Sequence, residues 1–313
     1  MLKILFMGTP DFAQESLKSI YDAGFEIIGV VTNPDKPKGR GMKLAYSPVK
    51  EYALEKNLKI YQPIKIKNNT EFLDEIKTLA LDVICVVAYG KILPKEILEI
   101  PKLGCINVHG SLLPKYRGAA PIQWAVINGE KVTGVTTMYM DIGMDTGDMI
   151  LKEEVSIGED ETTGELWDKL SEVGAKLLVK TLKQIEDGTA TRIPQGEDFS
   201  MAPMLNKEMS KINWNSQSAQ EIKNLVRGLN PIMGTYSYLN GKKIKFWKVN
   251  TLPLENTNAE NGTVIKSDSK EGLFIKAKDG IIQVLEIQGE NAKKMCIQDF
   301  LRGNEIKEGT VLK

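Results

Sequence analysis

The strongest constraint on the fold is the alternation of short β-rich runs with helical patterns over residues 1–187. The run D-V-I-C-V-V-A at residues 82–88 is apolar after its first position, as expected of a central parallel strand covered on both faces. We expect strands at Lys3–Met7, Glu26–Thr32, Lys59–Gln62, Asp82–Ala88 and Cys105–Val108. We expect helices at Asp11–Asp22, Pro48–Asn57, Thr70–Leu79 and Pro94–Glu99. This spacing predicts a doubly wound, mostly parallel α/β sheet of the Rossmann-like type.

The rest of the chain changes character after residue 187. A helix at Ala119–Asn128, strands at Val132–Met140 and Met149–Val155, and a helix at Thr163–Asp187 complete the first domain. Residues 188–206 contain two prolines, two glycines and no period, which is typical of a linker. After a helix at Ser218–Arg227, Asn-Gly and Asp-Gly turns separate strands at Tyr236–Leu239, Lys243–Val249, Gly262–Lys266, Leu273–Ala277 and Ile281–Ile287. We therefore expect domains at 1–187 and 207–313, the second a small antiparallel OB-like β-barrel.

Composition narrows the class of protein. The chain is 42% apolar and 26% charged, and no apolar run approaches the ~18 to 20 residues of a membrane span. The first residues are apolar only briefly before a turn, which indicates a strand rather than a signal peptide. The chain has one histidine, three widely spaced cysteines and no C-x-x-C, so we expect a cytoplasmic protein without a metal site.

Charge is distributed unevenly although the net charge is zero. Residues 1–205 hold 24 Lys and Arg against 29 Asp and Glu, whereas residues 206–313 hold 17 against 12. A net charge of +5 in the C-terminal part is compatible with contact with a polyanion, although a solvated face is the more common cause of such an excess.

The stretch I-N-V-H-G-S-L-L-P contains His109, the only histidine of the chain, at the predicted end of a strand. Because strand side chains alternate, Asn107 and His109 share a face. An amide and an imidazole there can direct hydrogen bonds at one developing oxyanion, as acyl transfer requires. The alternative is a polar strand end whose groups bond to backbone.

A second loop, D-I-G-M-D-T-G-D at residues 141–148, carries three carboxylates. A carboxylate beside an imidazole holds its orientation and stabilises its charged form, although a hairpin turn would also explain these residues. No nucleophile elbow accompanies them, which favours direct transfer between two bound substrates. The absence of G-x-G-x-x-G and of a P-loop motif argues against a dinucleotide or ATP site.

The chain resembles the tetrahydrofolate-dependent formyltransferases over nearly its whole length. The resemblance rests on the two segments above and on M-G-T-P-D-F, the loop N-P-D-K-P-K-G-R-G-M-K-L-A-Y-S-P-V-K and V-V-A-Y-G-K-I-L-P. The G-R-G loop and the added C-terminal domain resemble the branch that acts on methionyl-tRNA. The resemblance implies a formyltransferase fold and transfer of formyl from 10-formyltetrahydrofolate to the α-amine of methionyl initiator tRNA, by an enzyme that we expect to be a monomer.

The resemblance also implies site residues. Asn107, His109 and Asp145 form the expected catalytic set. The expected folate-pocket residues are Ser111, Leu112, Leu113, Pro114, Tyr89 and Gly90. Arg40 aligns with the key arginine of the loop that meets the tRNA acceptor end, with Lys38 and Lys43 beside it.

The C-terminal domain matches the family less closely. The family commonly has N-P-W-P-G-A where this chain has N-P-I-M-G-T, with Ile232 and Met233, and Glu305 stands where a basic residue is usual. The tRNA face there is expected to be weaker or differently placed. Lys245 remains in a lysine ribbon around Trp247 that could follow a nucleic-acid backbone.

Three other functions compete with this interpretation. A formyltransferase acting on a small amine, such as a sugar nucleotide or glycinamide ribotide, would leave the basic C-terminal part unexplained. A noncatalytic RNA-binding protein would not require Asn107, His109 and Asp145 to converge. A dinucleotide-dependent oxidoreductase lacks its glycine fingerprint.

Overall fold

The computed structural model describes residues 1–38, 43–254 and 257–313. The chain separates into two compact units, and each is considered by itself. The first comprises residues 1–121, 132–156 and 167–203, and the second comprises residues 122–131, 157–166 and 204–313. The expected domain boundaries at 187 and 206 remain a prediction, and the two short excursions at 122–131 and 157–166 were not expected. None of the helices in the described part of the chain combines the length and apolar character that crossing a bilayer requires.

The first unit is built on a seven-stranded sheet with the order β5-β2-β1-β6-β7-β8-β9. Its strands are β1 (Lys3–Gly8), β2 (Glu26–Val31), β5 (Ile60–Tyr61), β6 (Val83–Val87), β7 (Cys105–His109), β8 (Val132–Tyr139) and β9 (Met149–Ser156). The first five strands in this order, from β5 through β2, β1 and β6 to β7, pair in parallel. Strands β8 and β9 extend the sheet with antiparallel pairing. The predicted mostly parallel α/β sheet is therefore confirmed.

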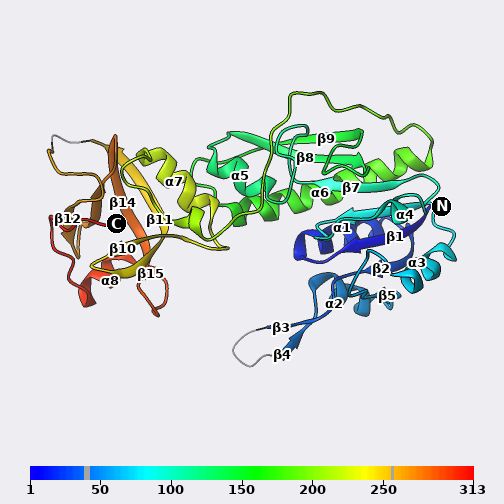
Figure 1. The fold of residues 1–313 in the computed structure, drawn as a ribbon, viewed down its shortest axis with the longest axis horizontal. Helices are drawn as coiled ribbons and strands as arrows, with labels where there is room; N and C mark the ends of the chain where they lie inside the picture. Colours follow the sequence, from blue (N-terminus) through cyan, green and yellow to red (C-terminus); the bar gives the residue numbers. More distant parts are fainter. Residues whose placement is uncertain (39–42, 255–256) are drawn as a thin grey trace. The chain divides into compact units, whose positions relative to one another are not determined.

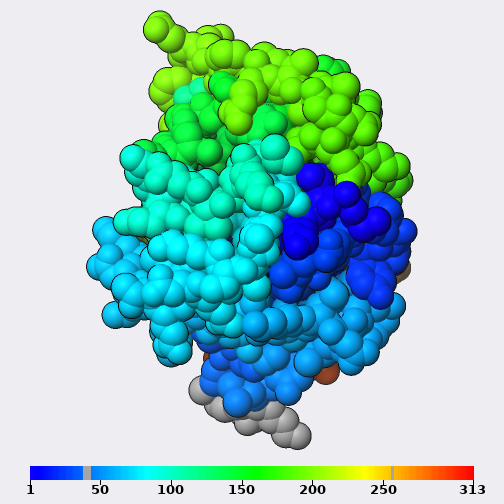
Figure 2. All heavy atoms as spheres, turned by 90° about the vertical axis from the view of Figure 1, so that its right-hand side faces the viewer, coloured from blue at the N-terminus to red at the C-terminus, as the bar shows by residue number. Residues whose placement is uncertain are grey.

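Helices connect the strands (Figure 1). They are α1 (Asp11–Asp22), α2 (Pro48–Glu55), α3 (Thr70–Lys77), α4 (Lys95–Leu98), α5 (Pro121–Ile127) and α6 (Thr163–Glu186). Two of these helices have N-cap residues whose side chains bond to the first turn. The Ser47 hydroxyl accepts from the Lys50 N–H at the start of α2, and the Asn69 side chain accepts from the Phe72 N–H at the start of α3. Figure 2 shows the start of the chain (dark blue) against the end of α6 (green), where the Leu2 N–H donates to Glu186 at 3.1 Å.

The two faces of the sheet have different neighbours. Residues of α3 and α4 join an apolar cluster with side chains of β1, β2 and β6, including Val86. Gly174 of α6 lies so close to Val108 that an added Cβ would come 3.0 Å from its methyl group. Since Val108 alternates with Asn107 and His109, the last two point away from α6. The predicted sharing of a face by Asn107 and His109 follows from this parity.

The loop that begins N-P-D-K-P-K contains two short strands that the sequence did not predict, β3 (Lys36–Lys38) and β4 (Lys43–Ala45). They pair antiparallel and form a separate two-stranded hairpin (Figure 1). Their short length and the exposure of Lys36, Pro37 and Leu44 explain why no alternating pattern revealed them.

The second unit contains an antiparallel sheet with the order β10-β11-β14-β13-β12, and β15 pairs with β14. Its elements are a 3₁₀ helix (Glu208–Ser210), α7 (Ala219–Gly228), β10 (Thr235–Leu239), β11 (Lys242–Pro253), β12 (Val264–Asp268), β13 (Gly272–Lys276), β14 (Gly280–Gln288), β15 (Met295–Cys296) and α8 (Ile297–Gly303). The last residues of the chain bond to both edges of the sheet. Lys313 pairs with Tyr238 of β10, and Leu312 bonds to Gly262, just before β12. This bridging accounts for the barrel-like character that the turn pattern predicted.

Candidate active site

His109 lies at the carboxyl end of β7, where the parallel strands of a doubly wound sheet present their ligand-binding loops. The ring is buried, and its Nε2 lies 2.9 Å from the Tyr116 carbonyl oxygen. Because a carbonyl can only accept, Nε2 must carry a hydrogen. In the neutral ring Nδ1 therefore holds the lone pair, and this atom lies 3.7 Å from Asp145 Oδ2.

Asp145 is held in place by backbone groups as well as by its neighbours. It lies in the loop between β8 and β9 with a φ of 54°, a left-handed conformation that Asp tolerates better than most residues. The Gly118 N–H donates to its Oδ2 at 2.8 Å. The carboxylate thus faces His109 with one oxygen already bonded, which restricts the direction in which it can turn.

Gln195 supports this loop from a segment that the sequence indicated only as a linker. Its Nε2 donates to the carbonyl oxygens of Asp145 and Gly147, both at 2.8 Å, and its Oε1 accepts from Arg117 Nε at 2.9 Å. Arg117 is itself bonded through its backbone to Ser200 and Ala202. Sequence reasoning missed Gln195 and Arg117 because a Gly/Pro-rich stretch has no period that places it against a particular loop.

Asn107 occupies the same face of β7, two residues before His109, and is half-buried. It stands opposite Val86 of β6 and Met138 of β8. Within the described part of the chain its side-chain amide makes no hydrogen bond, so its N–H groups are free to meet a ligand. The structure therefore brings Asn107, His109 and Asp145 to one strand end.

Four of the six residues expected in the folate pocket lie in the segment 111–114, and they divide into two pairs. Ser111 and Leu113 are fully buried: the Ser111 hydroxyl donates to the Lys115 carbonyl at 2.6 Å, and Leu113 packs in a small apolar cluster. Leu112 and Pro114 remain partly exposed. The second pair can present side chains to a ligand, whereas the first maintains the shape of the segment.

Tyr89 and Gly90 follow the end of β6, beside β7. The Tyr89 ring is buried in the apolar cluster below the sheet, its hydroxyl has no hydrogen-bond partner among the described residues, and burial raises its pKa to about 12. Gly90 is exposed with a φ of 76°. Tyr89 is therefore placed to contact a ligand through its backbone only, and Gly90 through an open turn.

The residues expected to contact tRNA are placed unevenly. Arg40 lies outside the described residues, and of Lys38 and Lys43 only the backbone, in β3 and β4, is described. Lys245 lies on the outer side of β11, where its Nζ donates to the Met233 carbonyl at 2.8 Å and stands 5.5 Å from the centre of the Trp247 ring. Of the three departures from the family pattern, Ile232 and Glu305 are exposed and Met233 is partly buried.

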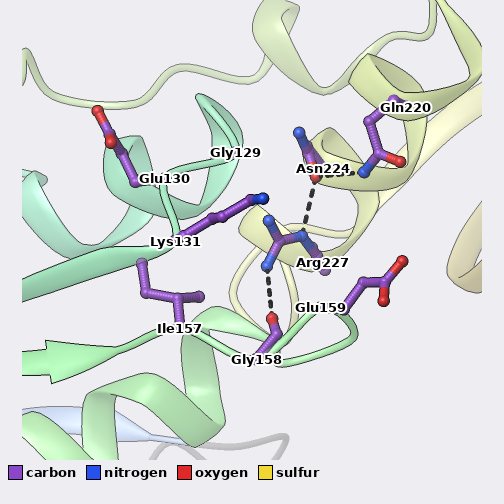
Figure 3. Close-up of a pocket in the computed structure, with 9 residues that line it drawn as sticks. All are labelled: Gly129, Glu130, Lys131, Ile157, Gly158, Glu159, Gln220, Asn224 and Arg227. Atoms are coloured by element: carbon purple, nitrogen blue, oxygen red, sulfur yellow. Dashed lines mark hydrogen bonds between the residues drawn. The ribbon is translucent and has the colours of Figure 1, made fainter.

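A cavity of about 430 Å³ lies elsewhere, in the second unit (Figure 3). It is lined by residues of α7 and of the segments 129–131 and 157–159. Arg227 is nearly fully buried there, and its guanidinium donates to Asn224 Oδ1 at 3.0 Å and to the carbonyls of Gly158 and Glu161, both at 3.2 Å. Burial lowers the pKa of Arg227. Through these hydrogen bonds Arg227 fixes the segment 157–161 against α7. None of the expected catalytic residues lines this cavity.

Comparison with known proteins agrees with the sequence resemblance. Residues 2–182 match the formyl transferase family, and residues 204–305 match the formyl transferase C-terminal domain. The chain is 55% identical to a methionyl-tRNA formyltransferase of Clostridioides difficile, covering 99% of the chain and 100% of that relative. It is 51% identical to one of Caldanaerobacter subterraneus, over the full length of both.

Solved structures share the fold at lower identity. An N-formyltransferase from Helicobacter canadensis, in complex with folinic acid and dTDP-3-aminofucose, superposes with a TM-score of 0.67 and 22% identity, covering 91% of this chain and 99% of that one. HypX from Aquifex aeolicus superposes with a TM-score of 0.65 and 16% identity, covering 98% of this chain and 49% of that one.

Proposed function

The chain belongs to the formyl transferase family, within the group of methionyl-tRNA formyltransferases, and on this premise we propose that it transfers the formyl group of 10-formyltetrahydrofolate to the α-amino group of methionyl initiator tRNA. The observation that carries the proposal is the pairing of the only histidine with Asp145 at the end of β7, beside Asn107, whose side-chain amide bonds to none of the described residues. The amine attacks the formyl carbon directly, without a covalent enzyme intermediate.

Asn107 acts on the oxygen of the formyl group. As the amine nitrogen bonds to the formyl carbon, the carbonyl oxygen gains negative charge, and the Asn107 amide donates a hydrogen bond to it. An amide that is already positioned on a strand needs little reorganisation when this charge develops. The buried imidazole two residues away adds positive charge when it is protonated.

His109 and Asp145 transfer the proton from the attacking amine to the folate nitrogen. The attacking nitrogen must lose a proton, and the folate nitrogen must gain one as its bond to carbon breaks. His109 Nδ1 is the ring atom that can accept a proton, and Asp145 Oδ2 at 3.7 Å stabilises the imidazolium that forms. Returning that proton to the folate nitrogen restores the neutral ring, so the cycle balances without another reactant.

The folate is held by the strand-end segments on either side of this group. Leu112 and Pro114 contribute exposed apolar surface, and Gly90 an open turn next to Tyr89. Ser111 and Leu113 keep the intervening backbone in place through their buried contacts. These roles come from the family and agree with the burial of each side chain.

The tRNA is held by cationic groups. Lys38 and Lys43 lie in β3 and β4, Arg40 stands between them in the sequence, and Lys245 belongs to the second unit. Lys245 alternates with the core residues Ile244 and Phe246 and so lies outside the barrel, where a lysine can meet a phosphate. The proposal also includes two domains, at 1–187 and 207–313, joined by a linker at 188–206. It further includes a monomeric state and a cytoplasmic location.

One assay tests the function. Purified protein receives 10-formyltetrahydrofolate labelled in the formyl group together with Met-tRNA, with free methionine or with an amino-sugar nucleotide. We expect label in Met-tRNA at a rate at least a hundredfold above the small amines. Label that reached only a small amine would contradict the tRNA assignment, and label in none of them would contradict the reaction.

A further inference from the structure

Three polar side chains form a closed cluster at the root of the β3–β4 hairpin. Asp35 directly precedes β3, and Lys50 lies in the first turn of α2, shortly after β4. Lys50 Nζ donates to Asp35 Oδ2 at 2.6 Å and to Gln62 Oε1 at 2.8 Å. Gln62 Nε2 donates to Asp35 Oδ1 at 2.9 Å. Each member thus bonds to the other two, and the cluster joins the two ends of the hairpin.

This ion pair is unusual for its burial. The side chains of Lys50 and Asp35 are only 13% and 20% exposed, whereas those of the pair Lys59 and Glu75 are 55% and 45% exposed. Hydrogen bonds from Lys50 and Gln62 hold the pKa of Asp35 below its ordinary value. A pair shielded from water interacts more strongly than a surface pair, and removing one partner leaves a charge unmatched.

Hydrogen bonds continue from this cluster to the strand-end loops. Gln62 Nε2 also donates to the Asn33 carbonyl at 3.0 Å. The Asn33 side chain donates to Thr9 Oγ1 at 3.0 Å and to the Tyr89 carbonyl at 2.9 Å. The root of the hairpin is therefore tied by a continuous set of bonds to the residue before Gly90.

Lys91 adds a second connection between the same parts. Its Nζ donates to the carbonyls of Pro63 and Ile64, directly after Gln62. The pKa of Lys91 is lowered first by burial and then by the positive charge of Lys36. Two independent contacts thus bring the hairpin root beside the loop that follows β6.

The described side chains of β3 and β4 have little apolar packing that could fix the direction of the hairpin. Lys36, Pro37 and Leu44 are all exposed, the last to 68% of its surface. Isolated two-stranded hairpins are at best marginally stable in water. The direction in which the hairpin leaves the unit therefore depends on the bonds at its root.

We propose that Asp35, Lys50 and Gln62 are positioning residues that set the direction of the tRNA-contacting hairpin relative to the Tyr89–Gly90 loop. This inference rests on the proposed function, which gives the hairpin its role in tRNA binding. The cluster acts through the hairpin backbone and touches neither substrate. Its loss therefore affects the tRNA more than the folate.

The test compares Lys50→Met, Asp35→Asn and the double variant in steady-state formylation. We expect each single change to raise KM for Met-tRNA by about tenfold, the effect of about 1.4 kcal/mol, with kcat and KM for 10-formyltetrahydrofolate within twofold. The double variant should lose little more than either single one, because both remove the same interaction. Lys50→Arg should restore most of the wild-type KM. Asp35→Asn keeps an acceptor for Gln62, so it remains informative if Lys50→Met folds poorly.

Lys59→Met is the matched control, since it removes an exposed ion pair of the same unit that does not touch the hairpin root. It should leave every kinetic constant within twofold. Unchanged KM for Met-tRNA in Lys50→Met and Asp35→Asn would overturn the positioning role while leaving the proposed function intact. Equal losses toward both substrates would also overturn it, because they indicate general damage. A wild-type protein that does not formylate Met-tRNA would overturn both proposals together.

Discussion

Replacing Asp145 by asparagine removes a charge from the candidate site and keeps the shape of the residue. The Asp145 carboxylate lies 3.7 Å from His109 Nδ1, and the two side chains are 17% and 6% exposed. At an effective dielectric constant of about 20, Coulomb's law gives roughly 4 kcal/mol between an imidazolium and a carboxylate at this distance. If that interaction stabilises the transition state, its loss slows the reaction by about a thousandfold.

The Asp145→Asn variant should change kcat and leave the KM values and the stability nearly unchanged. Because the asparagine oxygen can still accept from the Gly118 N–H, the loop should keep its conformation and the midpoint of thermal unfolding should change by only ~2 °C. We expect kcat for labelled formyl transfer to fall by about a thousandfold, with KM for both substrates within threefold.

Asp148→Asn is the control, since this carboxylate belongs to the same loop but faces Arg192 at 3.6 Å. It should retain a kcat within threefold of the wild type. A kcat for Asp145→Asn within fivefold of the wild type would refute the assignment of proton handling to the His109–Asp145 pair. A loss carried by KM alone would show that Asp145 serves binding instead.

Three further changes test other parts of the structure. Gln195→Leu removes two bonds to the Asp145 loop, and kcat should fall by ten- to a hundredfold with little change in KM; wild-type kcat would show that the loop holds itself. Arg227→Met removes the buried guanidinium that donates to the Gly158 and Glu161 carbonyls, and the free energy of unfolding in urea should fall by about 2 kcal/mol. The exposed Arg302→Met should change it by less than about 0.5 kcal/mol. Since the pKa of Asp35 is lowered in the folded protein, its ionised form stabilises the fold above the unfolded pKa of about 3.9. Urea unfolding at several pH values measures the difference in the free energy of unfolding between wild type and Asp35→Asn. This difference should be constant above about pH 5 and shrink as the pH falls through the folded pKa of Asp35. A difference that grew on acidification would contradict the predicted sign.

Local patterns predicted the sheet of the first unit well because its strands are short, apolar and regularly spaced. D-V-I-C-V-V-A is observed as β6 in the middle of the sheet, with every residue of Val83–Val87 buried. The same patterns could not predict β3 and β4, because the sequences K-P-K and K-L-A are too short to show an apolar alternation. They also described residues 188–206 only as a linker, although backbone bonds join Ser200 and Ala202 to Arg117.

The folate segment shows the same limit at the level of single residues. The motif S-L-L-P marks a segment, but it does not say which of its side chains face outward. Burial separates Ser111 and Leu113, which point inward, from Leu112 and Pro114, which keep exposed surface. That division depends on Thr136 of the neighbouring strand, whose hydroxyl bonds to the Ser111 carbonyl and the Leu113 N–H.

The sequence by itself determined the alternation of strands and helices, the parity that places Asn107 beside His109, and the family to which the motifs belong. These properties are local, because a side chain's face follows from its position along one strand. Only the tertiary structure decided that Gly118 and Gln195 would meet at Asp145, and that Asp35, Lys50 and Gln62 would close on one another. These contacts join residues far apart in the chain, and their distances depend on how whole elements pack, which no local period of hydrophobic residues specifies.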